Sequence, residues 1–418
     1  MAGYPVIACP HCDRLHRRTP IAAGAVAVCA RCGYVLYRQS AVPLSGWIAL
    51  TLAALLVFVI ANYFPVATLV LKGLTVNVSF LDALALTWRQ GHAALAIMTG
   101  LFGFILPAMQ LLFLLWALLA IASRRIPADF RYGMRVLNAM ASWSMVPVLM
   151  LGILVAMVKL AGLASLVIGP GLWAFGALTF LLTGLSRFSA QRLWRYAEDE
   201  QLVSQSGDRL ARGVDGVACQ SCGYVQNVDS TGRAQACQRC GATVRRRKPN
   251  SIPRTWALSI AAAILYVPAN ILPVMQIRGP VGGAVAHTIL GGVVELWNMG
   301  SWGLALIVFV ASVVVPMTKI LALMVLMVRR EWQGVEIQRQ RTRLYELVEF
   351  VGQWSMLDVF VVILLAAMAN FPGLSQVTAG PGAVSFGVVV ILTMFAAMSF
   401  DPRQGWDRRG AARLRETP

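Results

Sequence analysis

Long stretches without a charged residue alternate along the chain with shorter polar segments. The uncharged stretches cover residues 46–71, 93–123, 136–158, 160–186, 255–277, 296–318 and 359–400. A transmembrane helix needs about 20 consecutive, mostly apolar residues. The last stretch exceeds one span and is interrupted by Pro372, Gly373 and a Gly380-Pro381-Gly382 turn, so it contributes to two helices. The pattern therefore predicts eight transmembrane helices, at approximately 46–66, 93–122, 136–160, 164–186, 255–276, 301–328, 347–369 and 382–400.

The second half of the chain repeats the first at a nearly constant offset. Asn62-Tyr-Phe-Pro65 corresponds to Asn270-Ile-Leu-Pro273 at an offset of 208 residues, and Gly169-Pro170-Gly171 corresponds to Gly380-Pro381-Gly382 at an offset of 211. Such self-similarity indicates an internal duplication. Because each copy contains an even number of predicted helices, both copies enter the membrane from the same side, and the repeat is parallel.

Composition and charge exclude a soluble globular protein. Hydrophobic residues make up 58% of the chain and charged residues 13%, against about 45–50% and about 25% in soluble proteins. The chain holds 36 Lys and Arg against 18 Asp and Glu, a net charge of +18. Lys159 and Lys319 lie within predicted spans and Lys72, Arg89 and Arg278 in loops on one side, which leaves 31 basic residues on the other side. The positive-inside rule therefore places both termini and the cysteine-rich segments in the cytoplasm.

The eight cysteines form two quartets, each with C-x2-C-x(n)-C-x2-C spacing. The first quartet is Cys9, Cys12, Cys29 and Cys32, the second is Cys219, Cys222, Cys237 and Cys240, and n is 16 and 14. This spacing is typical of zinc ribbons, in which four thiolates surround one structural Zn²⁺. A glycine or an aspartate follows the second cysteine of each knuckle, where such turns require a positive φ. We therefore predict two structural zinc ions. Two disulfides per quartet and a redox-active C-x-x-C pair are the alternatives, which a reducing cytoplasm disfavours.

These features predict an all-α polytopic membrane protein with two parallel repeats of four transmembrane helices, each repeat preceded by a cytosolic zinc ribbon. The expected division is a first zinc ribbon at 1–45, a first transmembrane domain at 46–190, a linker and second zinc ribbon at 191–254, a second transmembrane domain at 255–400, and a cytosolic tail at 401–418.

The chain resembles the paraquat-inducible protein A family. Two strings of the second copy carry the resemblance, Trp354-Ser-Met-Leu-Asp-Val-Phe360 and Ser399-Phe-Asp-Pro-Arg403, together with the duplicated unit of a ribbon and four helices. The first copy departs from both strings, since Pro147 stands where the second copy has Asp358. The resemblance implies a protein of the Gram-negative inner membrane that works with a periplasmic MCE-domain protein and moves phospholipid between the two membranes.

Two classes of function are compatible with this sequence. The first is a non-enzymatic component of a lipid transport system, because the chain contains no P-loop, H-E-x-x-H or G-x-S-x-G motif. The second is a membrane-tethered zinc-ribbon protein that acts as a regulator or scaffold. A regulator that binds nucleic acid should carry basic and aromatic residues interleaved on its ribbons, yet the second ribbon has only Arg233 and Arg239 between its outer cysteines. We therefore favour lipid transport and expect no nucleic-acid partner.

Helix-breaking residues recur at the predicted periplasmic ends of the spans. They are Asn62, Pro65, Asn270, Pro273, Gly380 and Pro381. Proline and glycine end helices routinely, so simple termination is one interpretation. The other is a periplasmic gate, because irregular backbone at membrane depth is tolerated where it lines protein or water.

Two opposite charges lie within neighbouring spans of the second half. Lys319 lies ten residues before Arg329, about 15 Å deep at about 1.5 Å per residue. Asp358 reaches a similar depth from the same side in the next span, and Thr318 and Ser355 are polar neighbours in the sequence. The first half has Gln110 and Pro147 at the equivalent positions of the two charges. Ionisable groups within a membrane usually pair and often mark a transport pathway, so these residues are a candidate coupling site. A structural ion pair between two helices is the alternative.

Overall fold

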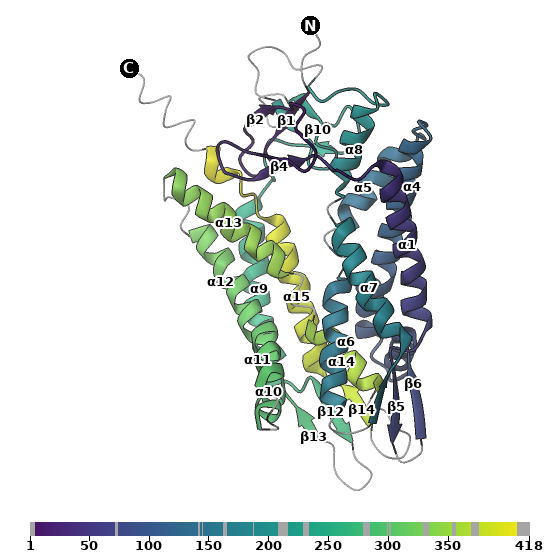
Figure 1. The fold of residues 1–418 in the computed structure, drawn as a ribbon. Coiled ribbons are helices and arrows are strands. Elements are labelled where there is room, and N and C mark those ends of the chain that lie inside the picture. The colour runs from purple at the N-terminus through teal and green to yellow at the C-terminus, as the bar shows by residue number, and fades with distance from the viewer. Residues whose placement is uncertain are drawn as a thin grey trace.

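The fold is taken from a computed structural model. It describes residues 5–71, 74–140, 143, 145–161, 165–186, 188–207, 216–228, 234–278, 285–298, 300, 302–328, 334–352, 357–368 and 376–407. Figure 1 shows a tall layer of helices with cysteine-rich segments at one end and short sheets at the other. We call these the ribbon end and the sheet end.

Each cysteine-rich segment folds into two short antiparallel hairpins. The first ribbon contains β1 (Val6–Ala8), β2 (Leu15–Arg17), β3 (Val26–Val28) and β4 (Val35–Arg38), paired β1–β2 and β3–β4. The second contains β8 (Gly216–Ala218), β9 (Val225–Asn227), β10 (Gln235–Ala236) and β11 (Thr243–Val244), paired β8–β9 and β10–β11.

The helices follow the same order in both halves. The first half contains α1 (Leu44–Tyr63), α2 (Phe80–Arg89), α3 (Ala93–Gly100), a π-helical turn η1 (Leu101–Ile105), α4 (Leu106–Ala122), α5 (Phe130–Met140), α6 (Val146–Ala161), α7 (Pro170–Leu185) and α8 (Ala190–Asp199). The second half contains α9 (Ser251–Ile271), α10 (Ile289–Asn298), α11 (Trp302–Phe309), a π-helical turn η2 (Val310–Val314), α12 (Val315–Val328), α13 (Val335–Gly352), α14 (Leu357–Met368) and α15 (Pro381–Ser399). The π-helical turns lie at equivalent places, and neither could be predicted from hydropathy.

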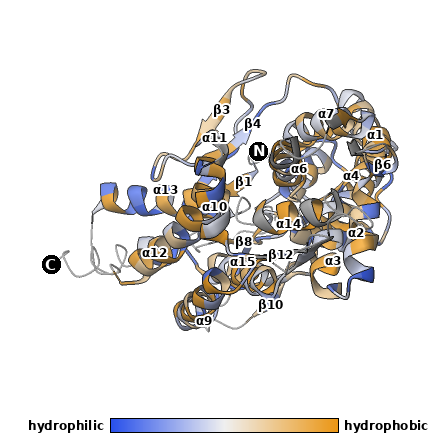
Figure 2. Ribbon diagram, turned by 90° about the horizontal axis from the view of Figure 1, so that it is seen from below, coloured by the Kyte–Doolittle hydropathy of each residue, from blue (hydrophilic) through white to orange (hydrophobic). Residues whose placement is uncertain are grey.

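Five helical segments of the described chain are long and apolar enough to cross a membrane. They are Leu44–Tyr63, Ala93–Ala122, Ser251–Ile271, Ala305–Val328 and Pro381–Asp407, and they coincide with five of the predicted spans. The other three predicted spans correspond to shorter helices: α6 and α7 have 16 residues each, and α14 has 12. Figure 2 shows the apolar character of the helices and the more hydrophilic character of α13. A helical membrane protein is therefore confirmed, whereas four spans per half stay a prediction.

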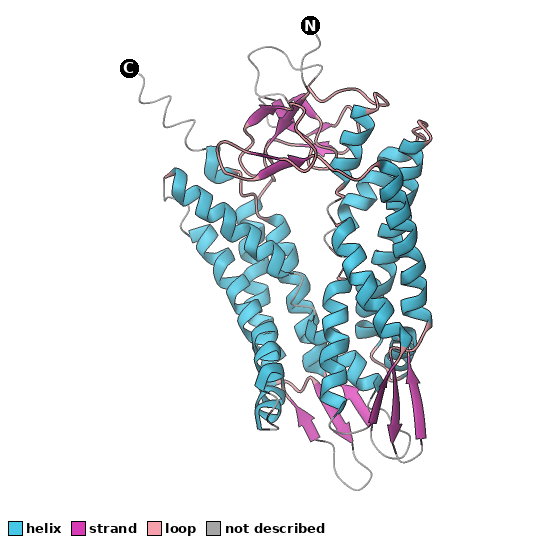
Figure 3. Ribbon diagram, in the orientation of Figure 1, coloured by secondary structure: helices cyan, strands magenta, loops and turns pink. Residues whose placement is uncertain are grey.

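The sheet end carries a three-stranded antiparallel sheet in each half. β5 (Ala67–Leu71) is central between β6 (Leu74–Val78) and β7 (Ser165–Ile168), and β12 (Met275–Arg278) is central between β13 (Val285–His287) and β14 (Gln376–Ala379). Leu69 faces Leu166 in the register, and Ile277 faces Val377. One outer strand of each sheet, β7 or β14, directly precedes a long helix, α7 or α15. Both sheets therefore lie at the same end of the helices (Figure 3).

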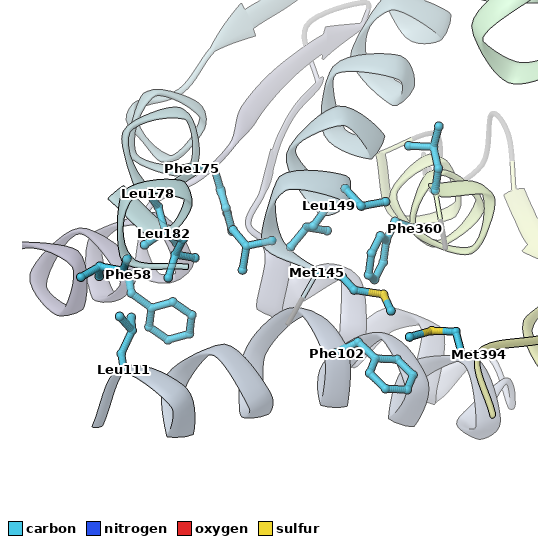
Figure 4. Packing of buried hydrophobic residues seen from close by; sticks show 14 of the residues in the cluster. Phe58, Phe102, Leu111, Met145, Leu149, Phe175, Leu178, Leu182, Phe360 and Met394 are labelled. Carbon is cyan, nitrogen blue, oxygen red and sulfur yellow. The ribbon is translucent and has the colours of Figure 1, made fainter. Parts of the chain in front are cut away.

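The largest hydrophobic cluster contains residues of both halves, and α14 of the second half packs against helices of the first. α1 packs on α7 in the first half and α9 packs on α15 in the second, but α14 packs most extensively on α6 and also contacts α2. Phe360 of α14 is buried beside Leu149 and Gly152 of α6 (Figure 4). The membrane region is therefore one interlocked unit rather than two separable bundles.

Candidate metal centres and the buried lysine

Each cysteine quartet gathers four sulfur atoms into a buried cluster. In both quartets the Sγ atoms lie within 4.8 Å of one another, and all eight cysteines are buried and free of disulfides. Cys9 and Cys32 lie 3.4 Å apart between Sγ atoms, Cys12 and Cys29 3.5 Å, and both close pairs of the second quartet 3.6 Å. A tetrahedral ion with metal–sulfur bonds of about 2.3 Å holds sulfurs about 3.8 Å apart. The quartets therefore fit one metal ion each, and a set of four thiolate donors suits zinc.

Backbone turns position the sulfurs as the spacing predicts. Gly33, Gly223 and Gly241 have φ of 81°, 75° and 67°, and Asp13 has φ of 57°. In each knuckle the amide of this residue donates to the carbonyl of the first cysteine, at 2.8 Å in the three glycine knuckles and 2.9 Å for Asp13. The expected positive φ is confirmed at all four positions.

His16 lies next to the first cluster. Its Nε2 is 3.3 Å from the Sγ of Cys29. Four sulfurs already complete a closed structural site, so we expect His16 to be a neighbour of the cluster and not a ligand.

Each ribbon contacts the helical half that it does not directly precede. The guanidinium of Arg31 in the first ribbon lies 4.8 Å from the ring centroid of Trp406, and Trp406 is buried against that ribbon's cysteines. In the second ribbon, Arg239 forms an ion pair with Glu198 of α8, and Arg135 of α5 donates to the carbonyl of Cys240. The metal-binding segments therefore tie the two halves together at the ribbon end.

The predicted charge of α12 is buried within the helices. Lys319 has 1% of its surface exposed, and its Nζ donates a hydrogen bond of 2.9 Å to Oγ1 of Thr393 on α15. Gly352, the last residue of α13, lies close to the same ammonium, since a Cβ there would lie 3.4 Å from Nζ. A buried ammonium needs such partners because desolvating an ion is costly.

Of the other members of the predicted coupling site, the structure describes only Thr318 in full. Asp358 is the second residue of α14, and its side chain lies outside what the structure describes, as does the whole of Ser355. Thr318 is exposed on α12, although it is next to the buried Lys319. The pairing of Lys319 with Asp358 therefore stays a prediction.

Thr393 is the residue that the sequence analysis missed. Its equivalent in the first half at the offset of 211 is Leu182, so Thr393, like Asp358, is a position at which the second half is polar and the first is not. This difference between the two repeats could have identified Thr393 from the sequence as a partner for a buried polar group.

The helix-breaking residues of the sheet end form one compact junction in each half. The amide of Gly171 donates to the carbonyl of Pro65 at 3.0 Å, and the amide of Gly382 donates to that of Pro273 at the same distance. The side-chain amides of Asn62 and Asn270 each donate at 2.8 Å to the carbonyl one helical turn earlier, at Phe58 and Tyr266. The two motifs of each half therefore hold each other, and a gating role for them stays a prediction.

Fold and sites define a helical multi-pass membrane protein with two four-cysteine centres at one end and a buried lysine in its second half. The chain belongs to the paraquat-inducible protein A family, whose model matches residues 44–198 and 252–409. The match covers both helical regions and omits both cysteine-rich ribbons.

Relatives align along nearly the whole chain. The chain is 33% identical to the intermembrane transport protein PqiA of Escherichia coli K12 over 96% of both chains. It is 29% identical to the lipophilic envelope-spanning tunnel protein A of the same organism over 97% of this chain and 92% of the relative, and 28% identical to a probable intermembrane transport protein of Haemophilus influenzae over 96% of both. No solved structure matches the chain.

Proposed function

We propose that this protein is the inner-membrane component of a system that passes lipids between the inner membrane and a periplasmic MCE-protein tunnel. The observation that carries the proposal is the full-length similarity to relatives named for intermembrane transport and for an envelope-spanning tunnel. In this proposal the chain crosses the membrane eight times, the ribbons bind zinc in the cytoplasm, and the sheet end faces the periplasmic partner.

The ribbon contacts favour transport over a nucleic-acid-binding regulator. Arg31 contacts Trp406, Arg239 pairs with Glu198, and Arg247 pairs with Asp13 and Asp407. These guanidinium groups are engaged within the chain, whereas a nucleic-acid surface needs basic groups that are available to phosphates.

In the proposed mechanism Lys319 and Asp358 form the coupling site within the second half. Burial of Lys319 and its hydrogen bond to Thr393 support this role, because a buried charge in a membrane is costly and is usually functional. The junctions at Asn62, Pro65, Asn270, Pro273, Gly380 and Pro381 shape the periplasmic outlet.

The test uses envelope integrity in cells that depend on this protein. Lys319→Met and Asp358→Asn are expected to abolish function while membrane abundance stays normal. Gln110→Leu is the matched control, because it removes a polar group at the equivalent position of the first half and should leave function intact. Full activity of both charge variants at normal abundance would contradict the coupling site. Loss of folded protein in both would favour a purely structural ion pair.

A further inference from the structure

A cavity of about 700 Å³ lies at the ribbon end. Its walls come from the first ribbon, α8, the knuckle of the second ribbon, α13 and the segment after α15. Pockets of about 300–1,000 Å³ are typical of small-molecule sites. Cys219 and Cys222 of the second metal centre contribute to one wall, but most of the lining residues belong to neither metal centre, and Lys319 is not among them. The cavity is therefore larger than the space of a metal centre.

Two arginines of α8 form one wall of the cavity. Arg192 and Arg195 are three residues apart and therefore project from the same face of the helix, and both line the cavity with Arg18 of the first ribbon. Arg18 is neutralised by Asp199, at 2.6 Å between nitrogen and oxygen, and approaches Glu198 at 3.7 Å. Three guanidinium groups thus gather at this wall, and the acids at the end of α8 offset the charge of Arg18.

Arg195 forms no ion pair within the described part of the chain. Its Nη1 donates to the carbonyl of Leu36 at 2.9 Å, and its Nε donates to the carbonyl of Gln191 at 3.3 Å. A guanidinium carries five N–H groups, so three remain available beside the cavity. Planar donor sets of this kind recognise phosphate oxygens.

The acids of the cavity limit the charge of its ligand. Asp13 and Asp401 are both engaged by Arg403, with shortest nitrogen–oxygen distances of 3.3 Å and 2.9 Å. Glu349 of α13 also lines the cavity. A negative group on the wall that α13 contributes favours a phosphodiester or a phosphomonoester over a polyphosphate such as a nucleoside triphosphate.

Two further cavity residues carry hydrogen-bond donors. Tyr34 is one of them, because its hydroxyl can donate a hydrogen bond. Lys248 donates to the carbonyls of Met398 and Phe400 at 2.6 Å and 3.1 Å.

The position of Arg192 relates the cavity to the membrane. Its guanidinium lies 4.7 Å from the ring centroid of Phe188 and 5.9 Å from that of Trp47. Trp47 lies in the first turn of α1, at the ribbon end of a candidate span, where tryptophans are enriched at lipid headgroup level.

We propose that this cavity binds a phosphate group through Arg192 and Arg195, as the headgroup of a phospholipid or as a soluble phosphate ester. The site stands on its own geometry, and its role as the place where lipid enters the protein rests on the proposed function.

Native mass spectrometry of the full-length protein in detergent tests the site. The probes are dioleoylphosphatidylglycerol, dioleoylglycerol, which has the same chains but no phosphate, and glycerol 3-phosphate. Arg195→Gln and Arg192→Gln are expected to weaken phosphatidylglycerol binding about tenfold each, whereas Arg195→Lys retains most of the affinity. Arg125→Gln is the matched control, since Arg125 is exposed and does not line the cavity.

Each outcome decides a different point. Equal affinity of the wild-type protein for phosphatidylglycerol and dioleoylglycerol would overturn the site, as would unchanged binding in both α8 variants that retain the wild-type melting temperature. Arginine-dependent binding of glycerol 3-phosphate alone would support the site and assign a soluble ligand. Loss of phospholipid binding in Arg195→Gln with normal envelope integrity would support the site but contradict its part in transport.

Discussion

Equivalent residues of the two halves differ in polarity where the second half buries Lys319. Lys319 of α12 corresponds to Gln110 of α4, and Thr393 of α15 corresponds to Leu182 of α7. Oε1 of Gln110 is buried without a hydrogen-bond partner in the described residues, whereas Lys319 has one. The same helical arrangement therefore holds a hydrogen-bonded Lys319–Thr393 pair in the second copy, and a leucine at the position of the threonine in the first.

Thr393→Val should weaken the protein and its function together. The substitution keeps the volume but removes the hydroxyl that accepts from Lys319, at a cost of about 1–3 kcal/mol for a buried charged donor left without its partner. We expect a lower melting temperature in detergent and reduced envelope integrity.

Thr393→Ser is the matched control for this substitution, because it retains the hydroxyl. It should restore both properties toward those of the wild type, and a serine variant as impaired as the valine variant would contradict the importance of the hydrogen bond.

At the scale of elements, the junctions of the sheet end leave no room for a side chain. A Cβ on Gly380 would overlap the carbonyl oxygen of Pro273, just as one on Gly169 would overlap that of Pro65. The Gly-Pro-Gly turns therefore serve two purposes: they allow two backbone segments to approach closely, and they separate each strand from the helix that follows.

Gly380→Ala is expected to destabilise the folded protein by about 3 kcal/mol, since the overlapped atom belongs to the backbone and cannot rotate away. Gly303→Ala in α11 is the control, because a Cβ there meets no atom within 4 Å. Replacing a helical glycine by alanine at such a site stabilises by up to about 1 kcal/mol. Thermal unfolding monitored by size-exclusion chromatography would distinguish the two, and equal melting temperatures would contradict the packing argument.

The strands of the sheet end show where pattern reading fails. Ala67–Leu71 continues the uncharged stretch of α1, so hydropathy alone did not separate this strand from the helix. Leu74–Val78 does alternate apolar and polar residues, which was a usable local signal. Its neighbour β5 also pairs with Ser165–Ile168, almost a hundred residues later, and no local pattern specifies such a partner.

At the scale of the whole molecule, the most local features were the most predictable. The cysteine spacing identified both metal clusters, because each knuckle is determined within a few residues. The contact of Lys319 with Thr393 depends on how α12 and α15 pack against each other. The periodicity of hydrophobic residues in a single sequence does not predict which helices pack together. The attachment of the first ribbon to Trp406 depends likewise on the complete fold.

Removal of the metal ions should unfold the two ribbons and disrupt the contacts between the halves at the ribbon end. Elemental analysis is expected to find two zinc ions per chain, and a strong chelator should make the ribbons sensitive to protease, because small four-cysteine sites fold only with their metal. Cys9→Ser and Cys219→Ser should each lower protein abundance.

His16→Ala is the control for metal binding and should retain two metal ions. A single bound metal in this variant would assign His16 as a ligand, and a stable metal-free protein with four disulfides would contradict the structural role.

The packing of α14 also sets the order in which the protein can be completed. Its partner α6 ends at Ala161, but α14 begins only at Leu357. At about 5–20 residues per second, the ribosome therefore leaves that face of the first repeat without its protein neighbour for on the order of ten seconds or more. During this interval lipid or an insertion factor must cover it. A gene truncated after the first repeat would encode a product in which α6 never acquires this neighbour. Neither half is therefore expected to fold as a complete protein without the other.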